Sequence, residues 1–185
     1  MKDISYISFS DPSTCWEDKD ARSIAYFSLN DVTRIDVKLF DELKNIAFEK
    51  NKNVRICMHH EPSDLLHDSV IIECRDSYYP PKKYINKSQS FHIIDGSVAM
   101  FIFNDNGEVI DCCVLDGKNC FVYRVEKNVY HTAIALTDYV IYHETTSGPY
   151  IGHDDRSFPS WGPQDINAPN YLEFKNNLLK SYDLL

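Results

Sequence analysis

Glycine and metal-binding cysteine motifs are scarce in this sequence. Glycine occurs six times in 185 residues, whereas tyrosine and phenylalanine occur 12 and 10 times. This balance favours strands packed with aromatic side chains. The six cysteines include no CxxC spacing, which argues against a structural zinc site built on cysteine. We expect reduced cysteines, with the adjacent Cys112 and Cys113 pointing to opposite faces of one strand.

A net positive charge and long apolar runs are also absent. The formal net charge is −9, which argues against nucleic acid and anionic membranes as partners, because both favour a basic surface. No apolar stretch reaches the length of a membrane span. The first residues, Met-Lys-Asp-Ile-Ser-Tyr, lack the apolar core of a signal peptide, so we expect a cytoplasmic protein. The sequence also has no phosphate-binding loop and no Ser-His-Asp arrangement.

One clear helix is predicted at residues 36–50. Its apolar residues recur at one-turn spacings and form a single stripe, which indicates a helix packed against a sheet. Asp36 is placed to cap the start of this helix. The stripe consists of Leu39, Phe40, Leu43, Ile46 and Ala47.

From residue 53 onward the pattern is typical of β-structure. Short apolar runs alternate with turns, and Asn104-Asp-Asn-Gly107 is a strong hairpin signal. About eight strands at such short intervals predict an all-β sandwich or barrel. The predicted strands are residues 54–58, 69–73, 90–94, 97–103, 109–115, 120–125, 131–136 and 139–144.

The two ends of the chain carry additional segments. Residues 1–34 form an extension with two strand-like pieces, 4–9 and 23–29, which could be a sheet edge, a dimer arm or a lid. Residues 148–167 are rich in Gly, Pro and Trp and are expected to wrap the barrel, with a closing helix at 170–179.

Several short motifs occur in one order between residues 35 and 165. They are Ile35-Asp36, Arg55, a histidine at 59 or 60, Asp95-Gly96, residues 103–108, Tyr130-His131-Thr132, Glu144, Gly148-Pro149-Tyr150 and residues 158–163. This order resembles the WbuC family of cupin-fold metalloproteins, which are often encoded beside O-antigen and other surface-polysaccharide genes. The resemblance implies an all-β, cupin-type double-stranded β-helix barrel, jelly-roll-like, with a flanking N-terminal helix. The cupin domain would then be residues 35–185, after the extension 1–34.

The resemblance also implies four metal-ligand positions, and three of them are changed here. Counting back from Gly96, the glutamate position falls on Gln89 and the first two histidine positions fall near Lys82 and Tyr84. Only the last histidine remains, as His131. A protonated lysine repels a divalent cation, and neutral glutamine is a weak ligand. We therefore favour no metal cofactor.

A divalent metal stays an alternative. In that case His131 would be joined by a histidine of the polar loop 59–68, which contains His59, His60 and His67. A solvated loop is the simpler interpretation of these three residues. His92 offers no replacement ligand, because strict alternation along a strand turns it away from the face of Gln89.

Three functions remain open from the sequence, and whether the protein is an enzyme is undecided. The first is a divergent cupin with a carbohydrate-related or sugar-nucleotide pocket, linked to surface-polysaccharide and O-antigen synthesis. The second is a metal-independent sugar-nucleotide isomerase or epimerase that uses His131 and Tyr84 as acid and base. The third is a metalloenzyme with relocated histidine ligands. A homodimer is expected. The candidate substrate-binding residues are Lys82, Gln89, His60, Glu144 and Tyr150.

Overall fold

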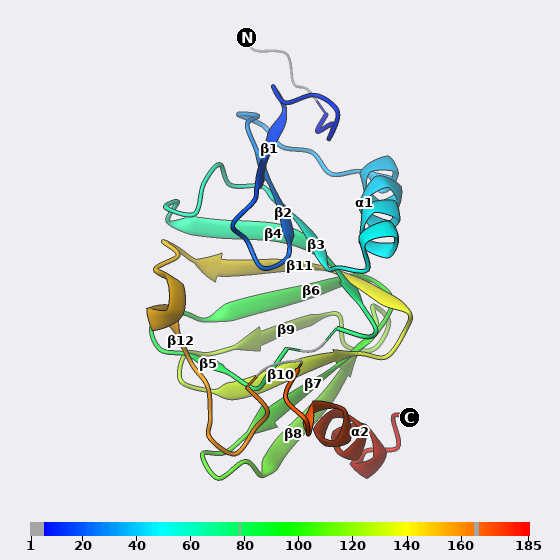
Figure 1. The fold of residues 1–185 in the computed structure, drawn as a ribbon, viewed down its shortest axis with the longest axis vertical. Helices are drawn as coiled ribbons and strands as arrows, with labels where there is room; N and C mark the ends of the chain where they lie inside the picture. The colour runs from blue at the N-terminus through cyan, green and yellow to red at the C-terminus, as the bar shows by residue number, and fades with distance from the viewer. Residues whose placement is uncertain (1–5, 78, 165–166) are drawn as a thin grey trace.

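The computed structural model describes residues 6–77, 79–164 and 167–185, which form two main β-sheets and two helices (Figure 1). The larger sheet has seven strands in the order β1-β2-β3-β4-β11-β6-β9, and the smaller has the order β10-β7-β8. A two-stranded pair joins β12 to β5. The strands are β1 (Cys15–Asp18), β2 (Ile24–Ser28), β3 (Val54–Cys57), β4 (Leu66–Cys74), β5 (Lys83–Tyr84), β6 (Gln89–Asp95), β7 (Val98–Phe103), β8 (Val109–Leu115), β9 (Val122–Val125), β10 (Tyr130–Ala135), β11 (Tyr139–Ser147) and β12 (Arg156–Ser157).

The strand order from β4 to β11 defines the fold. One sheet contains β4-β11-β6-β9, and the other contains β10-β7-β8, which β5 extends through an antiparallel bridge between Lys82 and His131. The chain crosses repeatedly from one sheet to the other, so strands distant in sequence become neighbours. This is the arrangement of an eight-stranded jelly roll, the architecture of cupins. The predicted all-β, cupin-type fold is confirmed.

Apolar side chains from both sheets pack between them. Phe91 and Tyr142 project from the larger sheet, and Met100 and Leu115 project from the smaller one. Alternation along each strand produces this inner face. The adjacent Cys112 and Cys113 contribute to different clusters, Cys113 to the one between the sheets and Cys112 to the one beneath the C-terminal helix. The predicted opposite orientation of these two cysteines is therefore confirmed.

The predicted N-terminal helix is confirmed as α1 (Val37–Lys50). The Asp36 carboxylate accepts a hydrogen bond of 3.0 Å from the backbone N–H of Leu39 and caps the helix start. Leu39, Leu43 and Ala47 are buried against β3 and β4 of the larger sheet. Figure 1 shows α1 beside the N-terminal part of this sheet. The apolar stripe read from the sequence is thus the packing face.

Two strands extend the larger sheet before α1. The predicted strand at residues 23–29 is confirmed as β2, which runs parallel to β3. The prediction at residues 4–9 is wrong for residues 6–9, which form no strand, and its remainder lies outside the described residues. The edge strand is instead β1, which pairs antiparallel with β2. Its sequence, Cys-Trp-Glu-Asp, has a weak strand pattern. The strand forms because its backbone pairs with β2. The division between residues 34 and 35 stays a prediction.

The described part of the C-terminal segment contacts β5 and the smaller sheet, while the predicted wrap over residues 148–167 includes residues 165 and 166, which lie outside the described residues. The cis Gly148-Pro149 bond follows β11, β12 pairs with β5, and Trp161 packs on Phe103 and Tyr130. A Cβ on Gly148 would lie 1.7 Å from the carbonyl oxygen of Asp64, so only glycine fits there. The predicted closing helix is α2 (Tyr171–Ser181), which packs beneath the smaller sheet (Figure 1).

The eight strands predicted between residues 54 and 144 all occur, whereas the two-residue strands β5 and β12 were not predicted. Over the described part of the chain, no helix has the length and apolar character needed to cross a bilayer.

Candidate functional site in the barrel interior

Three of the four residues that the family resemblance places at metal-ligand positions lie close together in the barrel. Lys82 and His131 exchange two backbone hydrogen bonds, of 3.0 and 2.9 Å, between the smaller sheet and the segment leading into β5. Gln89 at the start of β6 lies 3.0 Å from His131, measured from Oε1 to Nε2. Both side chains are almost completely buried, with 4% of His131 and 1% of Gln89 exposed. His92 on the same strand is exposed, as alternation predicts.

The hydrogen bonds of His131 determine its chemical state. Its Nδ1 lies 2.9 Å from the carbonyl oxygen of Val129, which can only accept, so Nδ1 carries a proton. Burial, together with the positive charge of Lys82, lowers the pKa of His131 to about 4. The neutral ring therefore has a lone pair on Nε2. The oxygen and nitrogen of an amide are assigned from the surrounding hydrogen bonds, so we assign the Gln89 NH₂ group to the side that faces the ring, where it donates to Nε2.

Tyr84, the residue at the fourth of these positions, lies beside Lys82. The Lys82 Nζ lies 5.1 Å from the ring centre of Tyr84 and 5.8 Å from that of Tyr79. A cation over an aromatic face is attracted by the ring quadrupole, which fixes the lysine near the two tyrosines. Lys82 is half-buried, so its ammonium supplies positive charge to the interior.

This donor set does not match a cupin metal site. An ammonium occupies one position, a neutral amide another, and the lone pair of His131 is already used by Gln89. Within the described residues, no group of three or more His, Cys, Asp or Glu side chains is arranged to hold a metal ion.

The buried carboxyl group of Glu73, which the sequence analysis did not identify, lies in the same interior. Glu73 on β4 is fully buried, and its Oε2 accepts a hydrogen bond of 3.1 Å from the Tyr142 hydroxyl. The other oxygen, Oε1, has no hydrogen-bond partner in the described part of the chain. Burial raises the pKa of Glu73 to about 8, so this carboxyl is mainly protonated at neutral pH. The positive charges of Lys82 and Lys175 oppose that rise.

Glu73 has further polar neighbours on the inner face. Burial, and next the charge of Glu73, raises the pKa of both Tyr79 and Tyr142. Glu144 lies two residues after Tyr142 on β11 and so shares its face, where its charge acts on Tyr79 and Tyr142. Arg55 on β3 influences Tyr79 as well, and its buried Nε also lacks a hydrogen-bond partner among the described residues. Unpartnered buried polar atoms need water or a ligand to satisfy them.

The sequence offered one weak signal for Glu73. It ends the apolar run Val70-Ile-Ile-Glu73, where alternation places it on the inner face with Ile71. A charged residue at an inward position of a core strand indicates a function or a buried partner. Nothing in the sequence singles out Tyr79 and Tyr142, and only the fold brings them to Glu73.

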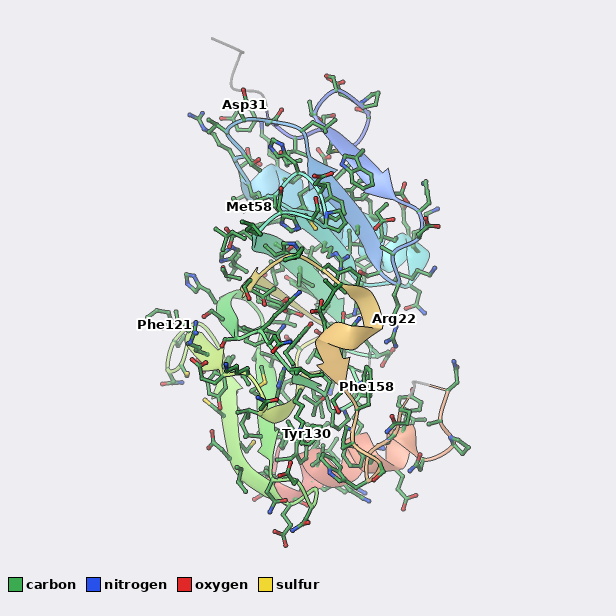
Figure 2. The ribbon with its side chains drawn as sticks, turned by 90° about the vertical axis from the view of Figure 1, so that its left-hand side faces the viewer. Arg22, Asp31, Met58, Phe121, Tyr130 and Phe158 are labelled. Atoms are coloured by element: carbon green, nitrogen blue, oxygen red, sulfur yellow. The ribbon has the colours of Figure 1, made fainter. Side chains whose placement is uncertain are left out.

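The predicted histidine loop forms a separate, more exposed cluster. The rings of His59 and His67 stack with centroids 4.2 Å apart, and burial lowers the pKa of both. His60 is exposed, and its Nε2 lies 3.2 Å from the carbonyl oxygen of Asn30. His59 and His60 line a surface pocket of about 360 Å³ together with Asp31 and Met58, both labelled in Figure 2.

Tyr150, the last predicted binding residue, lies on the C-terminal segment. It is half-exposed, and its hydroxyl accepts a hydrogen bond of 3.2 Å from Arg156 Nη2. Arg156 pairs with Tyr84 across β12 and β5. Tyr150 is therefore connected to the segment that carries Lys82, at the surface of the barrel.

Comparison with known proteins adds the following similarities. A family described as a domain of unknown function, DUF6016, matches residues 35–115, less than half of the chain. No curated protein matches the sequence. Among solved structures, CapF, a capsular polysaccharide assembling protein from Staphylococcus aureus, is 14% identical over 58% of this chain and 29% of its own, with a TM-score of 0.49.

Two other solved structures align over about half of this chain. KdgF from Halomonas sp. is 17% identical over 51% of this chain and 79% of its own, with a TM-score of 0.41. Procruciferin, an 11S globulin from Brassica napus, is 14% identical over 45% of this chain and 21% of its own, with a TM-score of 0.39. The chain thus spans less than a third of CapF and of the globulin. The strand order of the two sheets, and not these partial alignments, defines this chain as a cupin-type fold.

Proposed function

We propose that this protein binds a carbohydrate-related small molecule in its barrel interior without using a metal ion. The observation that carries the proposal is the convergence of Lys82, Gln89 and His131 near a buried carboxyl, Glu73, that has one unpartnered oxygen. Small-molecule sites combine apolar walls with a few convergent polar groups, and the interior between the sheets has this composition.

The polar groups favour a ligand with hydroxyl groups and a negative charge. Lys82 supplies a cation, and Glu73, which is mainly protonated at neutral pH, can donate a hydrogen bond from its free oxygen. Tyr84 adds an aromatic face close to Lys82, and its side chain carries a hydroxyl group. Sugar phosphates and sugar nucleotides meet these requirements, because they present hydroxyl groups beside an anionic phosphate.

The link to surface-polysaccharide and O-antigen synthesis rests on the sequence resemblance to the WbuC family. A cytoplasmic location and a homodimer belong to the same proposal. The chain would be a divergent member of this family, because Lys82, Tyr84 and Gln89 occupy the positions where the family has metal ligands.

Isomerase or epimerase chemistry on His131 is the weaker alternative. An acid–base catalyst needs a ring nitrogen that can exchange a proton with substrate near neutral pH. Both ring nitrogens of His131 are engaged, by Val129 and Gln89, and its pKa of about 4 keeps it neutral. The geometry therefore supports a positioning role for His131 in a binding site.

A thermal-shift experiment tests the proposal. A ligand at about 100 times its Kd stabilises the native state by about 2.7 kcal/mol, which raises the melting temperature. We expect such a rise with uridine diphosphate glucose or glucose 1-phosphate, and we expect Lys82→Met to remove it. Lys83→Met is the matched control, because Lys83 contacts Tyr130 and Asp105 instead of the interior tyrosines. No shift with either probe, or equal loss in both variants, would count against the proposal.

A further inference from the structure

Arg156 is a second cation at the edge of the candidate site. It lies on β12, which pairs antiparallel with β5, and Figure 1 shows these two short strands beside β10. In this register Arg156 is directly opposite Tyr84. Residues that are opposite each other on antiparallel strands share one face of the sheet. Arg156 therefore projects to the same side as Tyr84.

The side that Arg156 shares with Tyr84 is the one that faces the barrel interior. Lys82 and Tyr84 alternate with Lys83 along the chain, so they share a face. Lys82 is directly opposite His131, whose ring is almost completely buried. One face of β12, β5 and β10 thus carries four polar side chains in adjoining positions, namely Arg156, Tyr84, Lys82 and His131.

The two cations on this face have no anionic partner. Within the described residues, neither Lys82 nor Arg156 forms an ion pair, although Asp and Glu outnumber Lys and Arg by 28 to 19 in the sequence. Arg156 Nη2 donates a hydrogen bond of 3.2 Å to the Tyr150 hydroxyl, but the buried Nε has no hydrogen-bond partner in the described part of the chain. A buried donor without a partner needs water or a ligand. A negatively charged ligand would satisfy both side chains.

The placement of the two cations indicates a ligand with two anionic groups. Lys82 and Arg156 are diagonal neighbours across the strand pair, a relation that separates Cα atoms by about 7–8 Å and leaves long side chains within reach of each other. A guanidinium can donate two parallel hydrogen bonds to one phosphate, whereas an ammonium contacts a phosphate as a point charge. A diphosphate carries negative charge on two neighbouring phosphates, so it matches this pair of cations better than a monophosphate does.

We propose that Lys82 and Arg156 bind the two phosphates of a diphosphate, so that the site selects a nucleoside diphosphate sugar over a sugar monophosphate. The inference rests on the proposed binding function and adds the chemical class of its ligand. Arg156 provides the selectivity, because Lys82 alone is enough for one phosphate. Arg156 comes from a strand of only two residues, which is why the sequence pattern did not identify it.

Calorimetric titration of the full-length protein with uridine diphosphate glucose and with glucose 1-phosphate tests this selectivity. We expect the wild type to bind the diphosphate more tightly. Arg156→Gln should weaken the affinity for the diphosphate roughly 10- to 100-fold, as expected for the loss of charged hydrogen bonds, and should change the affinity for glucose 1-phosphate little. Arg156→Lys should recover part of the affinity, since it restores the charge without the planar guanidinium. Arg124→Gln is the matched control, because Arg124 is exposed and pairs with Glu126.

Inorganic pyrophosphate, as a third probe, separates this inference from the proposed function. If the wild type binds pyrophosphate but neither sugar probe, and Arg156→Gln weakens that binding, the diphosphate site stands and the carbohydrate proposal fails. If Arg156→Gln binds uridine diphosphate glucose as tightly as the wild type, or weakens both sugar probes equally, the diphosphate inference is overturned and the proposed function stands. Binding of no probe overturns both. Circular dichroism checks that each variant is folded, and Arg156→Lys carries the test if Arg156→Gln is not.

Discussion

Replacing Glu73 with glutamine is expected to make the free energy of unfolding much less dependent on pH. In the wild-type protein this free energy should fall as the pH rises, and most of that fall should be absent from the variant. The folded pKa of Glu73 is about 8, above its ordinary value of 4.5, so the folded state holds this proton more tightly than the unfolded state. The corresponding stabilisation is fully present below pH 4.5 and is lost as the pH rises through 8. At about 1.36 kcal/mol per pKa unit, the loss is roughly 5 kcal/mol.

The change Glu73→Gln keeps the size of the side chain and its acceptor for the Tyr142 hydroxyl, but it cannot ionise. Urea denaturation between about pH 5 and about pH 9 measures the free energy of unfolding of each protein. The wild type should weaken steeply over this range, and the variant should weaken much less. Glu49→Gln is the matched control, since Glu49 is exposed on α1. Equal slopes for wild type and Glu73→Gln would show that Glu73 is not held in its neutral form.

Replacing Asp155 with asparagine is expected to destabilise the protein by about 3–5 kcal/mol, because it leaves a buried ammonium unpaired. Asp155 Oδ2 lies 2.7 Å from Lys87 Nζ, and only 8% of the lysine side chain and 1% of the aspartate side chain are exposed. Lys87 also donates to the carbonyl oxygen of Pro149, and the Asp155 carboxylate accepts from the N–H of Ile151. The pair thus attaches the C-terminal segment to the strand-rich core.

An exposed ion pair serves as the control for this prediction. Arg124 and Glu126 lie equally close, at 2.7 Å, but more than half of each side chain is exposed. Glu126→Gln should therefore leave the free energy of unfolding almost unchanged. Urea denaturation of Asp155→Asn, Lys87→Met, the double variant Lys87→Met/Asp155→Asn and Glu126→Gln measures the free energy of unfolding of each. If Asp155→Asn costs no more than Glu126→Gln, or if the double variant is as unstable as the sum of its parts, the buried pair does not attach this segment.

Local patterns in the sequence predict most of the regular elements. Three elements depend only on residues within a few positions of one another, so helix and hairpin geometry is enough to predict them. They are the apolar stripe on α1, the Asp36 cap and the Asn104–Gly107 turn. The strands β5 and β12 escape prediction because two residues carry no periodicity. They exist because each pairs with the other across a large sequence separation.

The candidate site was predicted in part. The resemblance to the WbuC family placed Lys82, Gln89 and His131 at metal-ligand positions, and the structure brings them together through the bridge of Lys82 to His131 and the contact of Gln89 with His131. Glu73 was missed because its significance depends on burial and on Tyr142, which is 69 residues away. The occupation of His131 Nε2 by Gln89 also depends on a contact between strands of different sheets. Such partners follow from topology, which single-sequence patterns do not define.

The most direct test of metal-independent binding is calorimetric titration of the protein with uridine diphosphate glucose, before and after treatment with a chelator. Because Lys82 occupies one ligand position and Gln89 uses the lone pair of His131, the affinity should be unchanged by chelation and lost in Lys82→Met, while Lys83→Met binds normally. Binding that disappears on chelation, returns with zinc or manganese and is abolished by His131→Ala would contradict the account and establish a metal site.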